Sequence, residues 1–206
     1  MAAGVLAAAA AAYYGLAVRT PPGPRSLRVF DPDRTAELEV AMWQAYYRKE
    51  KVRLFSLLVT LLHEQNRYPW SKAVEAGFHL ARAAAVFGDA GSTVDAGVLR
   101  DLTRAYAIAG DWTHAGFDPE VVARAELAWW VARRRPEENA PAHVGALIAE
   151  EYARLYDAPV ESVARAGALR AEAADLRDRG GADADWPTVE RLLHESYRDL
   201  HEALGR

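Results

Sequence analysis

The chain has 206 residues, of which 51% are hydrophobic and 26% are charged, as in an ordinary globular protein. Its formal net charge of −4 lacks the strongly basic character of most nucleic-acid-binding domains, so we expect no nucleic-acid partner. The absence of cysteine excludes disulfides, thiolate catalysis, and thiolate-bound zinc or iron–sulfur sites.

Residues 1–18 form an uncharged segment that is rich in alanine. A membrane-spanning helix needs about 20 apolar residues, so this segment lies at the lower limit. It has no positive region before the apolar run, as a signal peptide normally has, and its alanines also suit a helix or arm in water. We expect an apolar helix that anchors the protein in a membrane. A cleaved signal peptide and a soluble arm are the alternatives.

Residues 19–29 are rich in proline and arginine, which is typical of a linker. The arginines precede the first acidic residue, Asp31, and such a positive flank favours the cytoplasmic side of a membrane. We therefore expect residues 30–206 to form a domain on the cytoplasmic side.

The remainder of the chain has apolar residues at three- and four-residue spacing and no strand-like alternation. A helix start occurs at Asp31-Pro32, and no proline or glycine follows before Asn66, so we expect one long helix from Asp33 to Arg67. Further helices are expected at residues 70–87, 94–108, 118–135, 141–156, 159–179 and 186–204, with a loop at 88–92. The sequence predicts an all-α protein.

Two patterns recur along the chain. F-D-P-x3-A-x2-E-x3-W begins at Phe30 and again 87 residues later at Phe117, and R-x-L-x3-Y begins at Arg100 and at Arg191. Self-similarity at a nearly fixed offset indicates an internal duplication. We expect two three-helix units packed about a pseudo-twofold axis as a bundle of six to seven helices or a short α-solenoid. The units span about residues 30–110 and 117–206.

The first pattern places one carboxylate in apolar, aromatic surroundings in each unit, Glu39 and Glu126. Two carboxylates that meet at a pseudo-twofold axis would have raised pKa values or bind a metal ion. In the simpler interpretation, each glutamate caps or salt-bridges a neighbouring helix. Glu64 and Glu151 are also equivalent, but on one continuous helix Glu39 and Glu64 would lie roughly 37 Å apart, which argues against a single four-carboxylate site.

Glu75 and His79 share a helical face and are further candidate metal ligands, with a hydrogen-bonded structural histidine as the alternative. The Glu-x-x-His spacing of carboxylate-bridged metal bundles is absent, and so are the P-loop, dinucleotide and serine-hydrolase motifs. We therefore predict no catalytic residue and no cofactor, and favour a binding role over an enzyme. The alternative is a carboxylate-bridged metal enzyme or a small-ligand-binding bundle.

Two basic clusters lie at equivalent positions of the two units. They are Arg48, Lys49, Lys51 and Arg53, and Arg133, Arg134 and Arg135. If the units pack symmetrically, both clusters share a surface for anionic head groups or an acidic partner. In the simpler interpretation they form a solvated face paired with nearby glutamates. The sequence thus predicts a membrane-anchored interaction or scaffold module, an accessory subunit of a larger membrane complex, whose partners are other protein subunits and the membrane.

Overall fold

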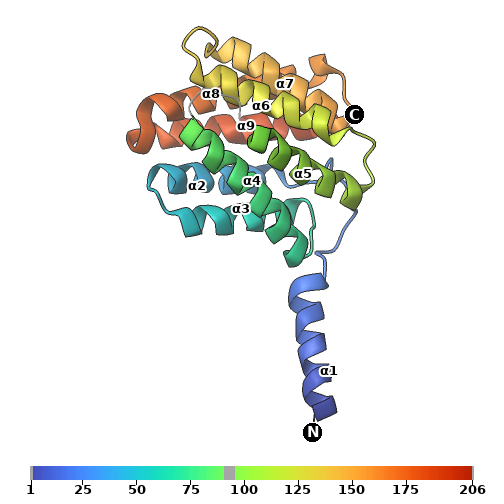
Figure 1. The fold of residues 1–206 in the computed structure, drawn as a ribbon. Helices are drawn as coiled ribbons and strands as arrows, with labels where there is room; N and C mark the ends of the chain where they lie inside the picture. Colours follow the sequence, from blue (N-terminus) through green and yellow to red (C-terminus); the bar gives the residue numbers. More distant parts are fainter. Residues whose placement is uncertain (1, 91–95, 206) are drawn as a thin grey trace.

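The computed structural model describes residues 2–90 and 96–205 of the chain, which contain helices and no strand (Figure 1). The all-α prediction is confirmed. The first helix, α1 (Ala2–Tyr13), continues into a π-helical turn, η1 (Tyr14–Val18), and projects away from all the other helices. We call α1 and η1 together the N-terminal segment, and helices α2 to α9 the helical body.

The helical body consists of two sets of four helices. The first quartet is α2 (Pro32–Tyr47), α3 (Lys51–Gln65), α4 (Trp70–Ala90) and α5 (Ala96–Thr113). The second quartet is α6 (Pro119–Arg134), α7 (Pro141–Tyr156), α8 (Val160–Gly180) and α9 (Trp186–Leu204), with a 3₁₀ turn, η2 (Gly181–Asp183), before α9. Asp31 and Asp118 cap α2 and α6, since each side chain accepts hydrogen bonds from two backbone N–H groups of its helix.

The predicted long helix from Asp33 to Arg67 is wrong, because the chain reverses between α2 and α3. Lys49, in this turn, has a φ of 60°, in the left-handed region that glycine adopts most readily. A lysine there gives little sequence signal for a turn. The two helices pack on each other as a hairpin instead of forming one rod.

This hairpin also overturns the long separation expected between Glu39 and Glu64. Glu64 of α3 returns to the first turns of α2, where its Oε2 accepts a hydrogen bond from Arg34 Nε at 2.9 Å. The argument from helix length against a shared site therefore no longer applies.

Two other helix boundaries differ from the expectation. Helix α4 extends to Ala90, through the first part of the loop predicted at 88–92, and α5 continues to Thr113, five residues past the predicted end at Ile108. The end of that loop and the predicted helix start at Val94 lie outside the described residues.

Each helix of the body packs against the next one, and α9 packs against α2, so the body closes into a ring of neighbouring helices. Helices α2 and α3 lie on the side nearer to α1, whereas α6 and α7 lie on the far side (Figure 1). Helices α7 and α8 approach closely at Gly145 and Gly167, where a Cβ added to Gly167 would lie 2.5 Å from the Gly145 carbonyl oxygen.

Four clusters of buried apolar side chains fill the body. One includes Tyr68 and lies between α3, α4 and α5, and one includes Ile148 and lies between α7, α8 and α9. The other two join the quartets. Leu102 and Leu127 belong to a cluster of α4, α5 and α6, and Leu193 belongs to a cluster of α2, α8 and α9. Apolar packing therefore joins the quartets at two places, α5 with α6 and α2 with α8 and α9.

Candidate functional site

Three glutamates lie inside the helical body, one each on α2, α6 and α7. Glu39 and Glu151 are only 5% and 6% exposed, and the Oε2 atom of Glu126 is buried. A cation, Arg170 of α8, accompanies them, with a side chain that is 15% exposed. Buried carboxylates are unfavourable unless they gain hydrogen bonds or an opposite charge, so the partners of each glutamate define what this region does.

Glu39 is held by side chains from α8 and α9 of the second quartet. Arg170 Nη2 donates a hydrogen bond to Glu39 Oε1 at 2.5 Å, and the Tyr197 hydroxyl of α9 donates to Glu39 Oε2. This arrangement pairs the charge and occupies both carboxylate oxygens. It agrees with the interpretation that Glu39 salt-bridges a neighbouring helix.

Glu151 accepts two hydrogen bonds from aromatic side chains. Trp129 Nε1 donates at 2.5 Å and the Tyr106 hydroxyl donates at 3.1 Å. Burial raises the pKa of Glu151, and the nearby Arg170 guanidinium offsets part of that rise. The same guanidinium lies 5.1 Å from the centroid of the Trp129 ring, so a cation–π contact connects the surroundings of Glu39 and Glu151.

Glu126 differs from both, because its Oε2 makes no hydrogen bond within the described residues. Burial and the neighbouring Glu151 raise the pKa of Glu126 to about 8, and the nearby Tyr106, Arg170 and Trp130 side chains offset only part of the rise. The Glu126 carboxyl group is therefore mostly protonated at pH 7, which reduces the negative charge in the interior.

These groups form one connected set, which we call the buried polar network. Its members are Glu39, Tyr106, Glu126, Trp129, Glu151, Arg170 and Tyr197. The structure thus brings Glu39 and Glu126 into the same network but links them through Arg170, Trp129 and Glu151. A buried hydroxyl group, that of Tyr152 on α7, also lacks a partner within the described residues.

The sequence pointed to part of this network. Tyr106 and Tyr197 occupy the same position of the second repeated pattern, so the pattern gave a signal for them. Arg170 gave none, because it lies on a helix with several other arginines, which is the usual appearance of a solvated face. Glu151 was found as an equivalent of Glu64, but its burial was not foreseen.

The other candidate metal ligands have separate partners. Glu75 Oε1 accepts a hydrogen bond from Arg104 Nη2 at 3.3 Å, whereas His79 Nδ1 lies 3.0 Å from Asp101 Oδ1. In the described parts of the chain, no group of three or more histidines and acids is arranged to hold a metal ion. Metal binding remains a prediction for Glu39, Glu126, Glu75 and His79.

The first basic cluster lies at the turn between α2 and α3. Arg48, Lys49 and Lys51 are exposed and form no ion pair with the described residues, whereas Arg53 Nη1 lies 3.0 Å from Glu50 Oε2. The neighbouring side chains of α2 and α3 add exposed apolar area, and Val52 is 86% exposed.

The second basic cluster is occupied by contacts within the protein. Arg133 Nη1 lies 2.8 Å from Asp178 Oδ2, and Arg135 Nη1 lies 3.1 Å from Glu138 Oε1. Arg134 Nη1 donates to the Phe87 carbonyl oxygen at 2.5 Å. The two clusters therefore present different surfaces, although they occupy equivalent positions of the sequence.

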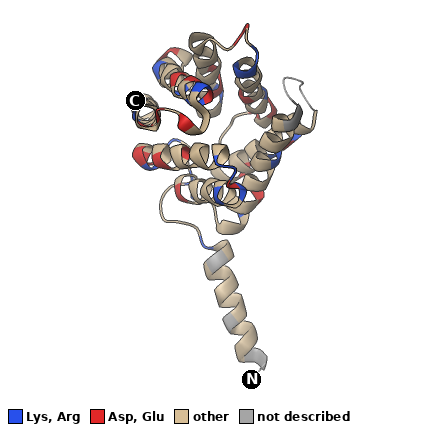
Figure 2. Cartoon of the chain, turned by 90° about the vertical axis from the view of Figure 1, so that its left-hand side faces the viewer, with Lys and Arg blue, Asp and Glu red and all other residues tan. Residues whose placement is uncertain are grey.

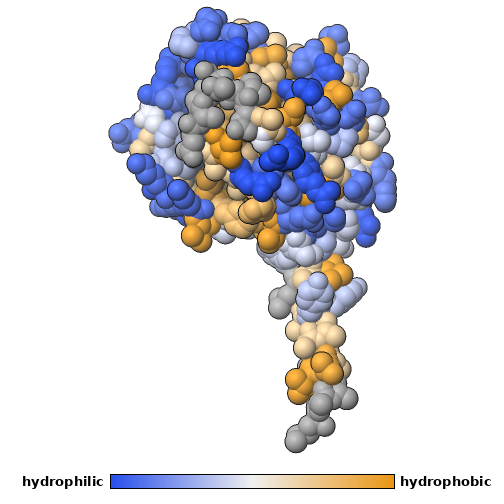
Figure 3. All heavy atoms as spheres, in the orientation of Figure 1, coloured by the Kyte–Doolittle hydropathy of each residue, from blue (hydrophilic) through white to orange (hydrophobic). Residues whose placement is uncertain are grey.

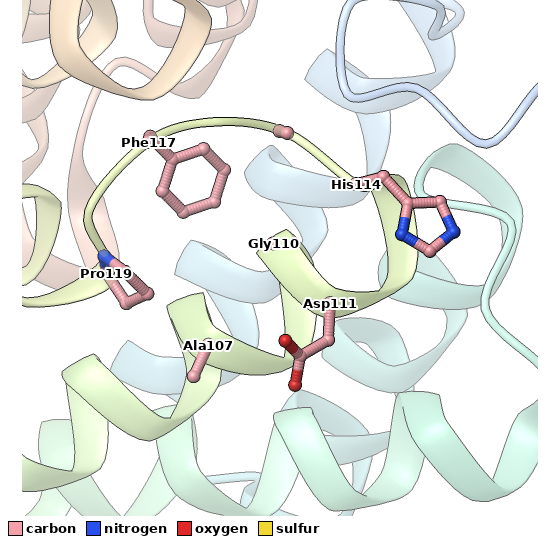
Figure 4. A pocket seen from close by; sticks show the side chains of 7 residues that line it. Ala107, Gly110, Asp111, His114, Phe117 and Pro119 are labelled. Carbon is pink, nitrogen blue, oxygen red and sulfur yellow. The ribbon is translucent and has the colours of Figure 1, made fainter.

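A shallow depression of about 530 Å³ lies at the connection between α5 and α6 (Figure 4). Its lining residues are Ala107, Gly110, Asp111, His114, Ala115, Phe117 and Pro119. Asp111 and His114 do not point towards each other, so their side chains form no acid–base pair (Figure 4). No member of the buried polar network lines this depression.

The N-terminal segment is the second unusual region. It carries no charge, and Val5 and Leu6 are 69% and 70% exposed (Figure 2). Its base is fixed to the body, because η1 packs on α4 and Ser71 Oγ donates to the Ala17 carbonyl oxygen at 2.8 Å. Arg67 holds the linker that follows, with its Nε donating to the Pro22 carbonyl oxygen at 3.0 Å.

Of the helices in the described ranges, none is both long enough and apolar enough to cross a membrane. The expected membrane-spanning helix is therefore unsupported. The chain matches no family model, no curated protein and no solved structure.

Proposed function

We propose that the protein is a helical interaction module attached to a membrane through its N-terminal segment, as an accessory subunit of a larger membrane complex. The observation that carries this proposal is the exposure of an uncharged helix, since its described side chains from Gly4 to Val18 are exposed except for the half-buried Ala17. Apolar residues occur on all its sides, and a helix of that kind is normally covered by protein or lipid. The space-filling view shows this apolar extension leaving the body (Figure 3).

The length of the segment favours insertion from one side of the bilayer. A helix of 17 residues is about 25 Å long, less than the roughly 30 Å of the hydrocarbon core. Tyr13 and Tyr14 are 64% and 63% exposed and lie towards the base, where aromatic residues are favoured at the membrane–water interface. We propose that the segment inserts with its N-terminal end deepest and keeps the body at the membrane surface.

The exposed turn between α2 and α3 is the proposed surface for a partner subunit. It combines three cations that have no ion pair within the described residues with an exposed tyrosine and valine, Tyr46 and Val52. Aromatic and basic side chains of this kind are common in protein–protein interfaces. A partner with an acidic surface fits this turn.

Flotation with lipid vesicles tests the membrane attachment. The full-length protein is expected to float with the vesicles, whereas a variant without residues 2–18 is expected to stay in the dense fraction. The truncated variant must keep the thermal unfolding transition of the body, as a control for folding. Failure of the full-length protein to float contradicts the proposal. If the protein floats with native membranes but not with protein-free vesicles, the segment recognises a protein instead of lipid.

We also infer that the two quartets derive from one duplicated four-helix unit. Their helices have 16, 15, 21 and 18 residues in the first quartet, and 16, 16, 21 and 19 in the second. Equivalent core residues occupy the two clusters that join the quartets, for example Leu102 and Leu193. These correspondences support the inference beyond the sequence patterns.

A small-ligand or metal site in the buried polar network is the second candidate. The observation in its favour is two buried oxygens without partners, Glu126 Oε2 and the Tyr152 hydroxyl. Elemental analysis of the purified protein tests it. Stoichiometric metal that is lost in the variant Glu126→Gln supports a site there, and metal-free protein that retains its full stability contradicts a metal site.

A further inference from the structure

Cations and tryptophans surround the point where the N-terminal segment meets the body. Arg19 directly follows η1, and Trp70 and Lys72 flank Ser71, whose hydroxyl binds the Ala17 carbonyl oxygen. Trp70 is 38% exposed and stacks on the His63 ring at 3.8 Å. We call Arg19, Arg25, Lys72, Trp70 and Trp112 the collar.

Trp112 of α5 holds two of the cations together. The Arg25 guanidinium carbon lies 3.9 Å from the centroid of the Trp112 ring, and Lys72 Nζ lies 5.9 Å from it. The indole itself is fixed, since its Nε1 donates to the Asn66 carbonyl oxygen at 3.1 Å. Cation–π contacts position the two charges without neutralising them.

The collar has a surplus of positive charge. Within the described residues, Arg19, Arg25 and Lys72 form no salt bridge, and the nearby Glu75 is paired with Arg104 at 3.3 Å. Asp111, adjacent to Trp112 in the sequence, forms no salt bridge with the described residues and is counted as an unpaired acid. Three cations against one unpaired acid favour an anionic ligand, and Arg19 and Arg25 are exposed to receive it.

The depth of the collar points to lipid phosphate as this ligand. If residues 2–18 lie in the hydrocarbon layer, the collar lies at the level of the head groups, where tryptophan and basic residues are enriched. A basic residue near an anionic membrane surface contributes about 1 kcal/mol, which is about a fivefold change in partitioning. Three cations together therefore correspond to roughly a hundredfold preference.

We propose that the collar binds the phosphate groups of anionic phospholipids and so gives the attached protein a preference for anionic membranes. This inference rests on the proposed attachment through the N-terminal segment. The segment provides the apolar contribution to binding, which is independent of head-group charge. The collar provides the charge-dependent contribution, which salt weakens.

Vesicle partitioning of the full-length protein tests the collar. The two vesicle types are phosphatidylcholine alone and an equimolar mixture of phosphatidylcholine and phosphatidylglycerol. We expect tighter binding to the mixture, and a loss of roughly a hundredfold at low salt in the variant Arg19→Gln/Arg25→Gln/Lys72→Gln. Its binding to phosphatidylcholine alone should stay unchanged.

The matched control removes the same charge from exposed positions of the second quartet, with Arg124→Gln/Arg154→Gln/Arg165→Gln on α6, α7 and α8. This control must keep most of the preference for the anionic mixture. Circular dichroism of both triple variants shows whether the body is folded.

The outcomes separate the two proposals. Equal binding of the full-length protein to both vesicle types overturns the collar and leaves the attachment intact. Absence of binding to either type overturns both. Displacement by inorganic phosphate, but not by chloride at the same ionic strength, identifies the collar as a site for free phosphate and overturns the lipid assignment.

Discussion

The N-terminal segment and the interior of the helical body depart in opposite ways from the usual distribution of polar and apolar residues. The segment exposes an uncharged helix, whereas the body buries Glu39, Glu126 and Glu151. In the body, most of the buried negative charge is compensated within the protein by one ion pair, several hydrogen bonds from aromatic side chains and one protonated carboxyl group. The exposed apolar side chains of the segment have no comparable contacts with the rest of the protein. We therefore assign stability to the buried polar network and attachment to the segment.

The largest effect is expected from removing the cation of the network. Arg170→Leu leaves Glu39 buried without an opposite charge, so the free energy of unfolding should fall by about 3–5 kcal/mol, as measured by urea denaturation. The control is Arg165→Leu on the same helix, whose exposed pair with Asp199 should contribute less than about 1 kcal/mol.

Equal stability of the two variants would contradict a stabilising role of Arg170. Loss of vesicle binding in folded Arg170→Leu, with its stability unchanged, would contradict the assignment of attachment to the segment.

The protonation of Glu126 predicts a pH dependence of stability. Its pKa is raised in the folded state from an ordinary value of 4.5 to about 8, so the folded state binds the proton more tightly than the unfolded state. The resulting contribution is complete below pH 4.5 and is lost as the pH rises towards 8. The free energy of unfolding should fall by about 2–4 kcal/mol across this window.

Glu126→Gln should flatten this profile, because the amide is neutral at every pH. The control Glu64→Gln changes a half-buried carboxylate that is paired with Arg34, and it should keep the slope of the wild type. Urea denaturation at several pH values gives both profiles. Parallel profiles for the wild type and Glu126→Gln contradict a protonated Glu126.

The two equivalent tyrosines should differ in effect. Tyr197→Phe removes a hydrogen bond to the charged Glu39, and a bond to a charged group contributes about 1.5–3 kcal/mol. Tyr106→Phe removes a longer bond of 3.1 Å to Glu151, which keeps the hydrogen bond from Trp129, and should decrease stability by about 1 kcal/mol. Thermal unfolding ranks the two variants, and a larger loss in Tyr106→Phe contradicts this account of the network.

The smallest effect is expected where the two regions meet. Ser71→Ala removes the exposed hydrogen bond to the Ala17 carbonyl oxygen and should change the stability of the body by less than about 1 kcal/mol. Vesicle binding should persist, since the apolar segment is intact. A large loss of stability in this variant means that the segment is part of the folded body.

The sequence was sufficient where local signals decide the structure. The helices expected at 141–156 and 186–204 have those bounds, because proline in their first turns is a start signal and Asp157 and Gly205 follow their ends directly. It failed at Lys49, where a residue with a side chain adopts a positive φ and reverses the chain. Packing in the tertiary structure decides that turn.

The sequence pointed to members of the buried polar network only where a sequence pattern occurs twice. Leu80 and Arg170 are both the eleventh residue of a 21-residue helix, so equivalent positions carry an apolar side chain in one quartet and a cation in the other. No repeat pattern predicts such a difference. The burial of Glu151 likewise depends on how α7 packs on its neighbours. The spacing of apolar residues along one helix does not determine this packing.

The central claim is that the segment inserts into lipid while the body stays outside it, and the absence of cysteine permits a direct measurement. A single environment-sensitive fluorophore on Val5→Cys is compared with one on Lys49→Cys, in vesicles that carry a quencher at the bilayer centre. We expect strong quenching at position 5 and none at position 49. Equal exposure of both labels to water, with the protein bound to the vesicles, would contradict the claim.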